Sequence, residues 1–365
     1  MRTIFYSGHS AGAFSRVLII ILIIASTILF KVPSLGAPFD RDSGLFAFLG
    51  YMHNQGHIIY KDLASSRPPG IIFLFALLFN FFKPTDITVN IFLLYWAILN
   101  VFLVYLLSLV LFNDFLGSCL AVVLYGFFSN SPFVNGDGAM TEHFMVTFNM
   151  LGFYFLIKAE KCKKIWPFLM SGLFFGVAFL FKQVGIFDYF AAMIYLLILV
   201  FLKYDKVTSF LKKVTAASLA FVLPFSISIL YYNYKGALKE FIFWVFEFNF
   251  KYIKLLGYNT GNYWQKFIYF NANIFKTTSI LWIGSIIFIF LLVRNLFRGR
   301  ITQNDFFKVY SNKFILMLWG VFSFIGVCSS SRFFPHYYIA ILVFNIRIDY
   351  FILLFECSYT YHFPI

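Results

Sequence analysis

Long apolar runs separated by short polar segments dominate this chain of 365 residues. A run of about 20 apolar residues can cross the roughly 30 Å hydrocarbon core as a helix, because a helix satisfies its backbone hydrogen bonds internally. The sequence lacks the alternating segments of about ten residues that are typical of membrane β-strands. The pattern therefore predicts an all-α polytopic membrane protein with about ten transmembrane helices, plus juxtamembrane helices in the first polar loop.

We expect residues 1–365 to form a single membrane-embedded domain. The predicted spans are Val17–Val32, Ile91–Phe112, Phe115–Phe128, Phe144–Ile157, Ile165–Phe181, Val184–Leu202, Val214–Tyr232, Thr277–Val293, Phe314–Cys328 and Tyr338–Phe355. The first follows a short basic segment, so a signal peptide ending at Ala37 is an alternative to an uncleaved span. Because Leu35 is too large for the small-residue pattern of a cleavage site, we favour an uncleaved span with a cytoplasmic N-terminus.

One short apolar run, Ile71–Phe82, decides the sidedness of everything after it. If it crosses, the basic loops Lys158–Lys164, Lys203–Lys213 and Arg294–Lys313 all face outward, against the positive-inside tendency. If it lies along the interface, all three face the cytoplasm together with the N-terminus. We therefore predict that Pro69–Phe82 is a juxtamembrane helix.

Four polar stretches then lie on the outer face of the membrane. They are the first loop (Pro33–Gly70), the second loop (Ser129–His143), the long loop (Asn233–Lys276) and the last loop (Ser329–Tyr337). The long loop carries six Lys against two Glu, an exception to the charge rule that its length allows. Its aromatic and basic stretch FIFWVFEFNFKYIKLL predicts a helix lying on the membrane surface.

Composition and charge narrow the class of protein. With 61% hydrophobic and 12% charged residues, the chain is not a soluble globular domain. The net charge of +14 comes from basic residues in the loops between spans, so we expect a lipid bilayer as partner and no nucleic acid. Cys119, Cys162, Cys328 and Cys357 stand singly without metal-binding spacing, so we expect no metal and no cofactor.

The candidate chemistry lies on the predicted outer face. Outside the long loop, its ionisable groups are Asp40, Arg41, Asp42, Lys61, Asp62, Arg67, Asp137, Glu142, His143, Lys182, Arg332 and His336. This mixture of a few acids with several cations fits the transfer of a group from a lipid-linked phosphate. Cations hold the charge that develops on a phosphate leaving group, and a carboxylate can take the proton of an acceptor hydroxyl. A nearby carboxylate also stabilises the oxocarbenium-like state of a transferred sugar.

The segment FDRDSGLFAFLGYMHNQGHIIYKDLASSRPPG resembles the first outer loop of the dolichyl-phosphate-mannose protein mannosyltransferase-like superfamily. These are membrane glycosyltransferases of the C type, and they include bacterial lipid A aminoarabinose transferases. Asp42 stands in the place of the family's Asp after the first span, and Gly56, Tyr60 and Asp62 match its G-x-x-x-Y-x-D turn. Further matches are Glu142 in TEHFMVTFNMLGFYFL, Lys182 in FLFKQVG, Asn249 and Tyr252 in FNFKY, and Arg332, His336 and Tyr337 in RFFPHYY.

Two features depart from the family pattern. Ser43 replaces the Glu that commonly follows the Asp, which weakens any claim for a paired-carboxylate or metal site. The chain also stops soon after its tenth predicted span, whereas relatives often continue, so a truncated or altered end is one expectation.

The resemblance implies a role for each matching residue, and each role has a structural alternative. Asp42 is the implied general base toward the acceptor, and the alternative is a helix N-cap. Glu142 orients acceptor or donor, or else pairs with a cation at the start of its span. Lys182 binds the lipid phosphate, because an unpaired ammonium between apolar spans is costly, or else its side chain extends to the membrane interface.

The remaining candidates contribute to substrate binding. Arg332 and His336 complete the phosphate site or anchor the chain at the interface. Lys61 and Arg67 are weaker phosphate candidates. His143 and Tyr337 are further substrate-binding candidates, and the alternative for Tyr337 is a place in the interfacial aromatic belt.

The function implied is transfer of a sugar, with inversion, from a polyprenyl-phosphate-linked donor to an acceptor at the extracytoplasmic face of the plasma (inner) membrane. The carrier would be undecaprenyl phosphate in a bacterium, and the acceptor a glycolipid, a polysaccharide or a protein. One alternative is a transporter or flippase of lipid-linked sugars, which would need charges near the bilayer midplane. Another is a polysaccharide polymerase, which would lack this first-loop pattern.

Overall fold

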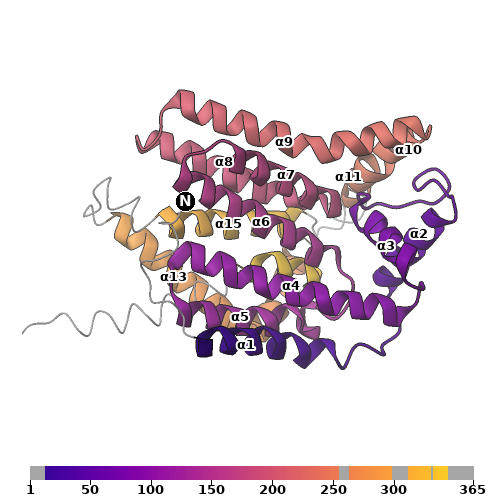
Figure 1. Cartoon of the computed structure of the whole chain (residues 1–365), viewed down its shortest axis with the longest axis horizontal. Helices are drawn as coiled ribbons and strands as arrows, with labels where there is room; N and C mark the ends of the chain where they lie inside the picture. Colours follow the sequence, from indigo (N-terminus) through magenta and orange to yellow (C-terminus); the bar gives the residue numbers. More distant parts are fainter. Residues whose placement is uncertain (1–12, 255–262, 298–310, 330–331, 344–365) are drawn as a thin grey trace, which may run out of the picture.

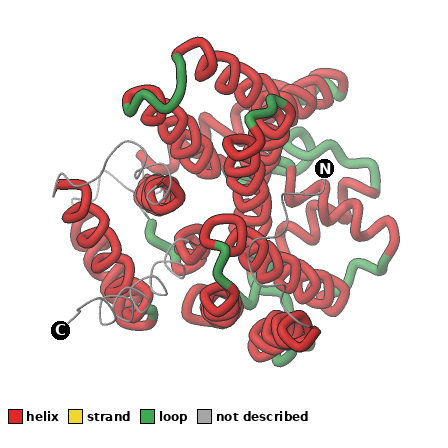
Figure 2. Tube along the Cα trace, turned by 60° about the vertical axis from the view of Figure 1, so that its left-hand side comes forward, coloured by secondary structure: helices red, strands yellow, loops and turns green. Residues whose placement is uncertain are grey.

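The computed structural model describes residues 13–254, 263–297, 311–329 and 332–343, and the ranges below refer to these parts. They form fourteen α-helices and short 3₁₀ or π segments, and Figure 2 shows no strand among them. The long helices are α1 (Ala13–Lys31), α4 (Asp86–Phe112), α5 (Phe115–Ser129), α6 (Thr141–Cys162), α7 (Trp166–Phe181), α8 (Ile186–Phe201), α9 (Val207–Tyr234), α13 (Ser279–Phe297) and α15 (Ser311–Ser329). The shorter ones are α2 (Arg41–Asn54), α3 (Gly70–Phe81), α10 (Leu238–Ile242), α11 (Phe248–Ile253) and α12 (Tyr263–Thr277).

The apolar helices make this a multi-pass membrane protein. In the described part of the chain, four segments are long and apolar enough to span a membrane: α4, Gln183–Phe201, α9 and α15. Shorter apolar segments are Val17–Leu29, Gly70–Phe81, Phe115–Ser129 and Trp166–Phe181.

A helix stands at nine of the ten predicted spans. The largest differences are at helix ends, where α6 runs on to Cys162 and α9 begins already at Val207. Both extensions are rich in lysine, so apolar content alone placed the helix ends too far inward. The tenth predicted span, Tyr338–Phe355, lies largely outside the described residues, and its described part is helical from Ile339 to Val343.

The long helices run side by side in a bundle (Figure 1). In that view α9, α7 and α6 lie above α4, α5 and α1. A close backbone contact joins α7 to α9: a Cβ added at Gly172 would meet the Ala217 carbonyl oxygen at 1.9 Å, and one at Gly176 the Phe221 oxygen at 2.2 Å. Glycines four residues apart let two helix backbones approach closely, as in membrane helix pairs. No larger residue would fit this seam.

The first loop and the start of the long loop lie at one end of the bundle, on the right of Figure 1. The predicted helix Pro69–Phe82 is confirmed as α3, which packs along α2. A Cβ at Gly50 of α2 would lie 2.8 Å from Cβ of Phe75, so glycine permits this close pairing. The helix predicted in the long loop is also confirmed, as α10, a π-helix (Phe243–Glu247) and α11.

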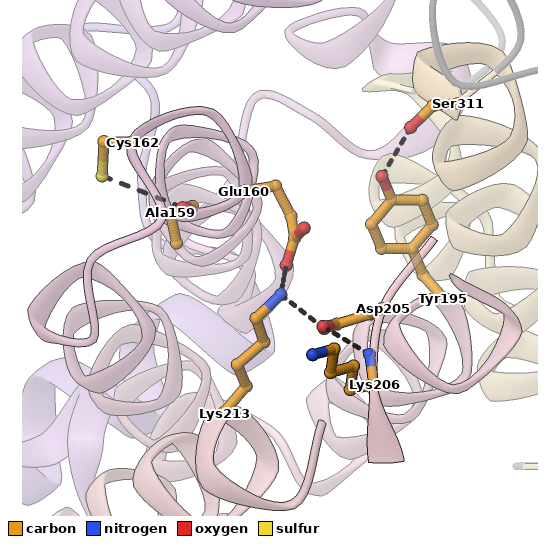
Figure 3. A network of polar contacts seen from close by, with 8 residues as sticks. All are labelled: Ala159, Glu160, Cys162, Tyr195, Asp205, Lys206, Lys213 and Ser311. Carbon is orange, nitrogen blue, oxygen red and sulfur yellow. Dashed lines mark hydrogen bonds and ion pairs between the residues drawn. The ribbon is translucent and has the colours of Figure 1, made fainter. Parts of the chain in front are cut away.

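A polar network joins helix ends at the opposite end of the bundle (Figure 3). Lys213 Nζ lies 2.7 Å from Glu160 Oε1 and 2.7 Å from Asp205 Oδ2, and Tyr195 Oη lies 2.6 Å from Ser311 Oγ. The loops Lys158–Lys164 and Lys203–Lys213 are therefore close together. The predicted grouping of the basic loops on one face agrees with this contact.

Candidate active site

A cavity of about 640 Å³ opens at the end of the bundle that carries the first loop. Its ionisable lining consists of Arg41, Asp42, Arg67, Lys182 and Arg332 together with Tyr252 and Tyr337. Much of the remaining wall is apolar and comes from α2, the α7–α8 junction, α8 and the π-helix with α11. A hydrocarbon chain and an anionic headgroup could both be accommodated by such a lining.

Asp40, and not Asp42, is the N-cap of α2. Its Oδ1 accepts hydrogen bonds from the backbone N–H groups of Asp42 (2.8 Å) and Ser43 (2.9 Å). The capping alternative for Asp42 is therefore wrong. Asp42 lies in the first turn, where its Oδ1 is 2.9 Å from Nε of Arg41, and its side chain, 19% exposed, lines the cavity. It remains available for chemistry.

Ser43, the departure from the family pattern, joins two loops. Its hydroxyl donates to Asp40 Oδ2 at 2.5 Å and accepts from the backbone N–H of Ala139 at 2.8 Å. The first loop is thereby fixed to the second loop, which ends where α6 begins. An ionised glutamate at this position could accept from Ala139 but could not donate to Asp40.

The G-x-x-x-Y-x-D turn has a backbone explanation. Gly56 and Tyr60 have φ of 94° and 76°, in the left-handed region, and Asp62 Oδ2 accepts the N–H of Ile58 at 2.7 Å. The Tyr60 hydroxyl donates to the carbonyl oxygen of Arg67 at 2.7 Å. The turn therefore directs the chain back so that Arg67 reaches the cavity.

Gly70 brings the start of α3 against the end of α7. A Cβ at Gly70 would lie 2.6 Å from the carbonyl oxygen of Leu180, two residues before Lys182. This close approach places Arg67 and Lys182 on the same wall of the cavity. Their charges interact, because Arg67 contributes to lowering the pKa of Lys182.

Lys182 is buried, with an exposed fraction of 4%, and it is paired. Its Nζ forms an ion pair with Glu142 Oε1 and lies 3.6 Å above the centre of the Tyr337 ring. The premise of an unpaired ammonium is therefore wrong, and so is the alternative of a side chain extended to the interface. Burial lowers the pKa of Lys182 to about 8, although the Glu142 carboxylate opposes this shift.

Glu142 is the centre of a buried cluster behind the cavity wall. Besides Lys182, it has the Thr141 hydroxyl 3.0 Å from Oε2 and His336 Nε2 3.9 Å from Oε1. Burial lowers the pKa of His336, so this imidazole is neutral at neutral pH. Glu142 therefore pairs with a cation, as the structural alternative predicted. This pairing holds Lys182 in place.

Arg332 and Tyr337 bring the last loop to the cavity. The guanidinium carbon of Arg332 lies 4.0 Å above the centre of the Tyr252 ring, within the range of a cation–π contact. Tyr337 is 7% exposed beneath Lys182, so it does not belong to a lipid-facing aromatic belt.

Two predicted residues lie away from the cavity. Lys61 is exposed and does not line it. His143 is buried, with Nε2 3.0 Å from the carbonyl oxygen of Gly136. Within the described residues, no group of three or more His, Cys, Asp or Glu is arranged to bind a metal ion.

Seven polar lining residues were not assigned to the site from the sequence: Arg41, Ser65, Ser66, Gln183, Asn249, Tyr252 and Ser329. Arg41 and Gln183 each directly adjoin a predicted residue, Asp42 and Lys182, and this adjacency was the available signal. Asn249 was noted only as part of the FNFKY match. Its contacts are described below.

The comparisons with known proteins agree with this architecture. A family model described as dolichyl-phosphate-mannose-protein mannosyltransferase matches residues 66–231. Among solved structures, the fold is similar to an archaeal oligosaccharyltransferase, AglB from Archaeoglobus fulgidus, in complex with an inhibitory peptide and a dolichol-phosphate. The TM-score is 0.56 at 11% identity, over 95% of this chain and 51% of AglB, so the chain spans about half the length of that protein. No curated protein matches the sequence.

Proposed function

We propose that this chain transfers a sugar from a polyprenyl-phosphate donor to an acceptor on the extracytoplasmic side of the membrane, because its residues 66–231 match the dolichyl-phosphate-mannose-protein mannosyltransferase family model. The match agrees with the resemblance seen in the sequence over these residues, and it supports the proposal that the chain is a membrane glycosyltransferase. The dolichol-phosphate in the AglB structure supports a polyprenyl-type carrier.

One observation carries the proposal: cationic and carboxylate side chains meet in a cavity whose other walls are largely apolar. Arg67, Lys182 and Arg332 line it together with Asp42. The hydrophobic lining residues include Phe179 of α7, Phe187 of α8 and Phe250 of α11. A lipid-linked sugar phosphate needs this combination, because its tail is apolar and its phosphate is anionic. A soluble nucleotide-sugar would not need the apolar wall.

Transfer then proceeds by direct displacement. Asp42 takes the proton of the acceptor hydroxyl, whose oxygen attacks the anomeric carbon while the bond from that carbon to the phosphate oxygen breaks. The leaving phosphate gains no proton, since Arg67, Lys182 and Arg332 stabilise its charge. Attack opposite the leaving group inverts the anomeric centre.

Glu142 and His336 lie behind the cavity wall and act through Lys182. Lysine has three N–H donors, so Lys182 can bind Glu142 with one and still offer others to a phosphate. The neutral His336 adds no competing positive charge near Glu142. In this proposal both residues hold Lys182 in place and neither contacts the reacting atoms. His143 and Lys61 have no part in it, because they lie outside the lining.

We propose a topology of ten crossings with both termini in the cytoplasm. In this topology, loops 33–70 and 233–276 contribute to a site that faces outward. The chain forms a single domain in the plasma membrane of a bacterial host. Supporting this, the cavity and the network around Lys213 lie at opposite ends of the bundle, and basic loops favour the cytoplasmic side.

The acceptor is proposed by class: a glycolipid, a polysaccharide or a protein. The inhibitory peptide bound to AglB is in keeping with a protein acceptor, and that observation belongs to AglB. The carrier proposed for a bacterial host is undecaprenyl phosphate.

The substitution Asp42→Asn tests the proposed function. The purified enzyme in nanodiscs, supplied with polyprenyl-phosphate sugars and candidate acceptors, is expected to release polyprenyl phosphate. Asp42→Asn should reduce this release by about 10²-fold or more, because positioned general bases typically contribute about 10²–10⁴-fold. Binding of undecaprenyl phosphate should remain, since the three cations are intact.

Asp86→Asn is the matched control. Asp86 begins α4, lies outside the cavity lining and carries the same functional group. It should keep full transfer. An Asp42→Asn enzyme that is as active as this control would rule out Asp42 as the base.

A further inference from the structure

Two carboxamides in the cavity wall bind the same pair of backbone carbonyl oxygens. Gln183 Nε2 lies 2.9 Å from the oxygen of Val245 and 3.3 Å from that of Ser66. Asn249 Nδ2 lies 2.9 Å and 2.8 Å from the same two oxygens. All four residues line the cavity, and we call this arrangement the amide clamp. Each NH₂ group has two donors, so each can bind both carbonyls.

The amide clamp joins three segments that are far apart in sequence. Ser66 lies in the first loop, Gln183 follows α7, and Val245 and Asn249 lie in the long loop. The contacts of Ser66 with Gln183 and with Asn249 span 117 and 183 sequence positions, and the Gln183–Val245 contact spans 62. The Asn249–Val245 contact, in contrast, spans four positions. Local helix geometry therefore does not account for the amide clamp.

The Val245 carbonyl lies in the π-helix. In Phe243–Glu247 the backbone bonds are of the i→i+5 kind, as from the Phe248 N–H to the Phe243 oxygen. A backbone carbonyl oxygen has two lone pairs, so it can accept more than one hydrogen bond. Asn249 Nδ2 also lies 3.3 Å from the oxygen of Trp244. Isolated π segments in proteins are frequent at functional sites.

The clamp fixes the backbone beside Arg67. The Ser66 carbonyl belongs to the peptide unit that leads into Arg67, and the Arg67 N–H lies 3.3 Å from the Ser65 hydroxyl. On the far side, the Arg67 carbonyl accepts the Tyr60 hydroxyl at 2.7 Å. Both peptide units next to Arg67 are thus held by side chains. This restraint fixes the backbone from which the Arg67 side chain extends to the cavity.

The clamp acts on the other wall of the cavity as well. Tyr252, whose ring supports Arg332, follows Asn249 by three residues on the same helix. Holding Asn249 against the first loop therefore also holds Tyr252.

We propose that Gln183 and Asn249 are positioning residues, which hold the first loop to the long loop so that Arg67 and Arg332 face the donor phosphate together. The phosphate in this statement rests on the proposed function, whereas the joining of the two loops does not. Because each amide binds both carbonyls, either one compensates in part for loss of the other. The effects of removing them should therefore be non-additive.

The test uses the full chain in nanodiscs and the near-isosteric variants Gln183→Met, Asn249→Leu and both together. Two quantities are measured: the Kd for undecaprenyl phosphate and the hydrogen exchange of backbone amides 243–253. Each single variant should weaken binding by about twofold to fivefold, and the double variant by about 30-fold or more, in line with the loss of several hydrogen bonds. Exchange should be fastest in the double variant.

The controls separate positioning from general stability. Gln55→Met removes an exposed carboxamide of the first loop, outside the cavity, and should change neither quantity. Asn249→Gln keeps the NH₂ donor and should recover part of the affinity lost in Asn249→Leu. If the double variant does not accumulate in membranes, the single variants carry the same test at smaller amplitude.

The outcomes distinguish the two proposals. Unchanged Kd in the double variant overturns the positioning role even if exchange rises. If the wild-type protein neither binds the lipid phosphate nor transfers a sugar, the proposed function fails. Hydrogen exchange of amides 243–253 then tests whether the amide clamp joins the two loops. Faster exchange in the double variant than in the wild type supports this role, and equal exchange overturns it.

Discussion

Lys182 stays beside an apolar cavity because its neighbours offset the loss of hydration. The carboxylate of Glu142 provides the counter-charge and the face of Tyr337 provides a cation–π contact at 3.6 Å. Buried ion pairs do little for stability by themselves, since desolvation offsets much of the attraction. We therefore infer that pairing with Glu142 keeps the Lys182 ammonium charged and shielded from water, so that it can bind an anion.

The pH dependence of donor binding tests this interpretation. Burial lowers the pKa of Lys182 to about 8, so the amine loses its proton above that pH and with it the attraction for a phosphate. The Kd of undecaprenyl phosphate should rise by up to about tenfold per pH unit above pH 8, because only the charged form binds well. The ligand itself keeps its charge there, since its second pKa is near 6.

Lys182→Arg provides the comparison. A guanidinium keeps its charge to above pH 12 or so, and its profile between pH 8 and pH 10 should be flat. The measurement is the slope of log Kd against pH for both proteins. Parallel slopes would mean that Lys182 does not meet the phosphate.

At the scale of elements, the sequence predicted α3 well and the contacts around it poorly. A dozen apolar residues after two prolines define that helix, and its predicted juxtamembrane position rests on the charges of distant loops. The pairing of Glu142 with Lys182 spans 40 positions, and nothing in the local pattern encodes it. Which of Asp40 and Asp42 caps α2 likewise depends on backbone geometry that the pattern of residue types does not contain. The sequence could therefore rank candidate site residues, but it could not predict which side chains each of them contacts.

Gly70→Ala tests the junction of α3 with α7. The new Cβ would lie 2.6 Å from the Leu180 carbonyl oxygen, so the start of α3 must shift away from the end of α7. The free energy of unfolding should fall by about 1–3 kcal/mol, the usual cost of overpacking. Because Arg67 and Lys182 both line the cavity close to this junction, affinity for undecaprenyl phosphate should fall as well.

Gly36→Ala is the control for that experiment. A Cβ at Gly36 meets no atom within 4 Å, so the same added methyl group should leave stability and affinity unchanged. If Gly70→Ala behaves like Gly36→Ala, the close approach does not position the site.

At the scale of the whole molecule, the two opposite ends of the helix bundle differ in chemistry. One end holds the cavity with its cations and Asp42, and the other holds the network of Lys213, Glu160 and Asp205. The assignment of these ends to the two sides of the membrane rests on the charge rule. A labelling experiment can establish it directly.

The topology predicts opposite accessibility for two exposed lysines replaced by cysteine, Lys61→Cys in the first loop and Lys164→Cys between α6 and α7. In intact cells, with the four natural cysteines replaced, a membrane-impermeant maleimide should label Lys61→Cys. Lys164→Cys should react only after permeabilisation. Labelling of Lys164→Cys in intact cells would place the active site in the cytoplasm.

The glycine seam between α7 and α9 has a mechanical consequence. The backbone of α9 is packed against α7 at Gly172 and Gly176, so any displacement of α9 to admit a bulky lipid would have to separate this contact. The π-helix and α11 line the cavity, and Gly236, between α9 and α10, has φ of 64° with open space around its α-carbon. A rotation of the lining segment about Gly236 would leave the α7–α9 contact in place, but it would have to break the amide clamp.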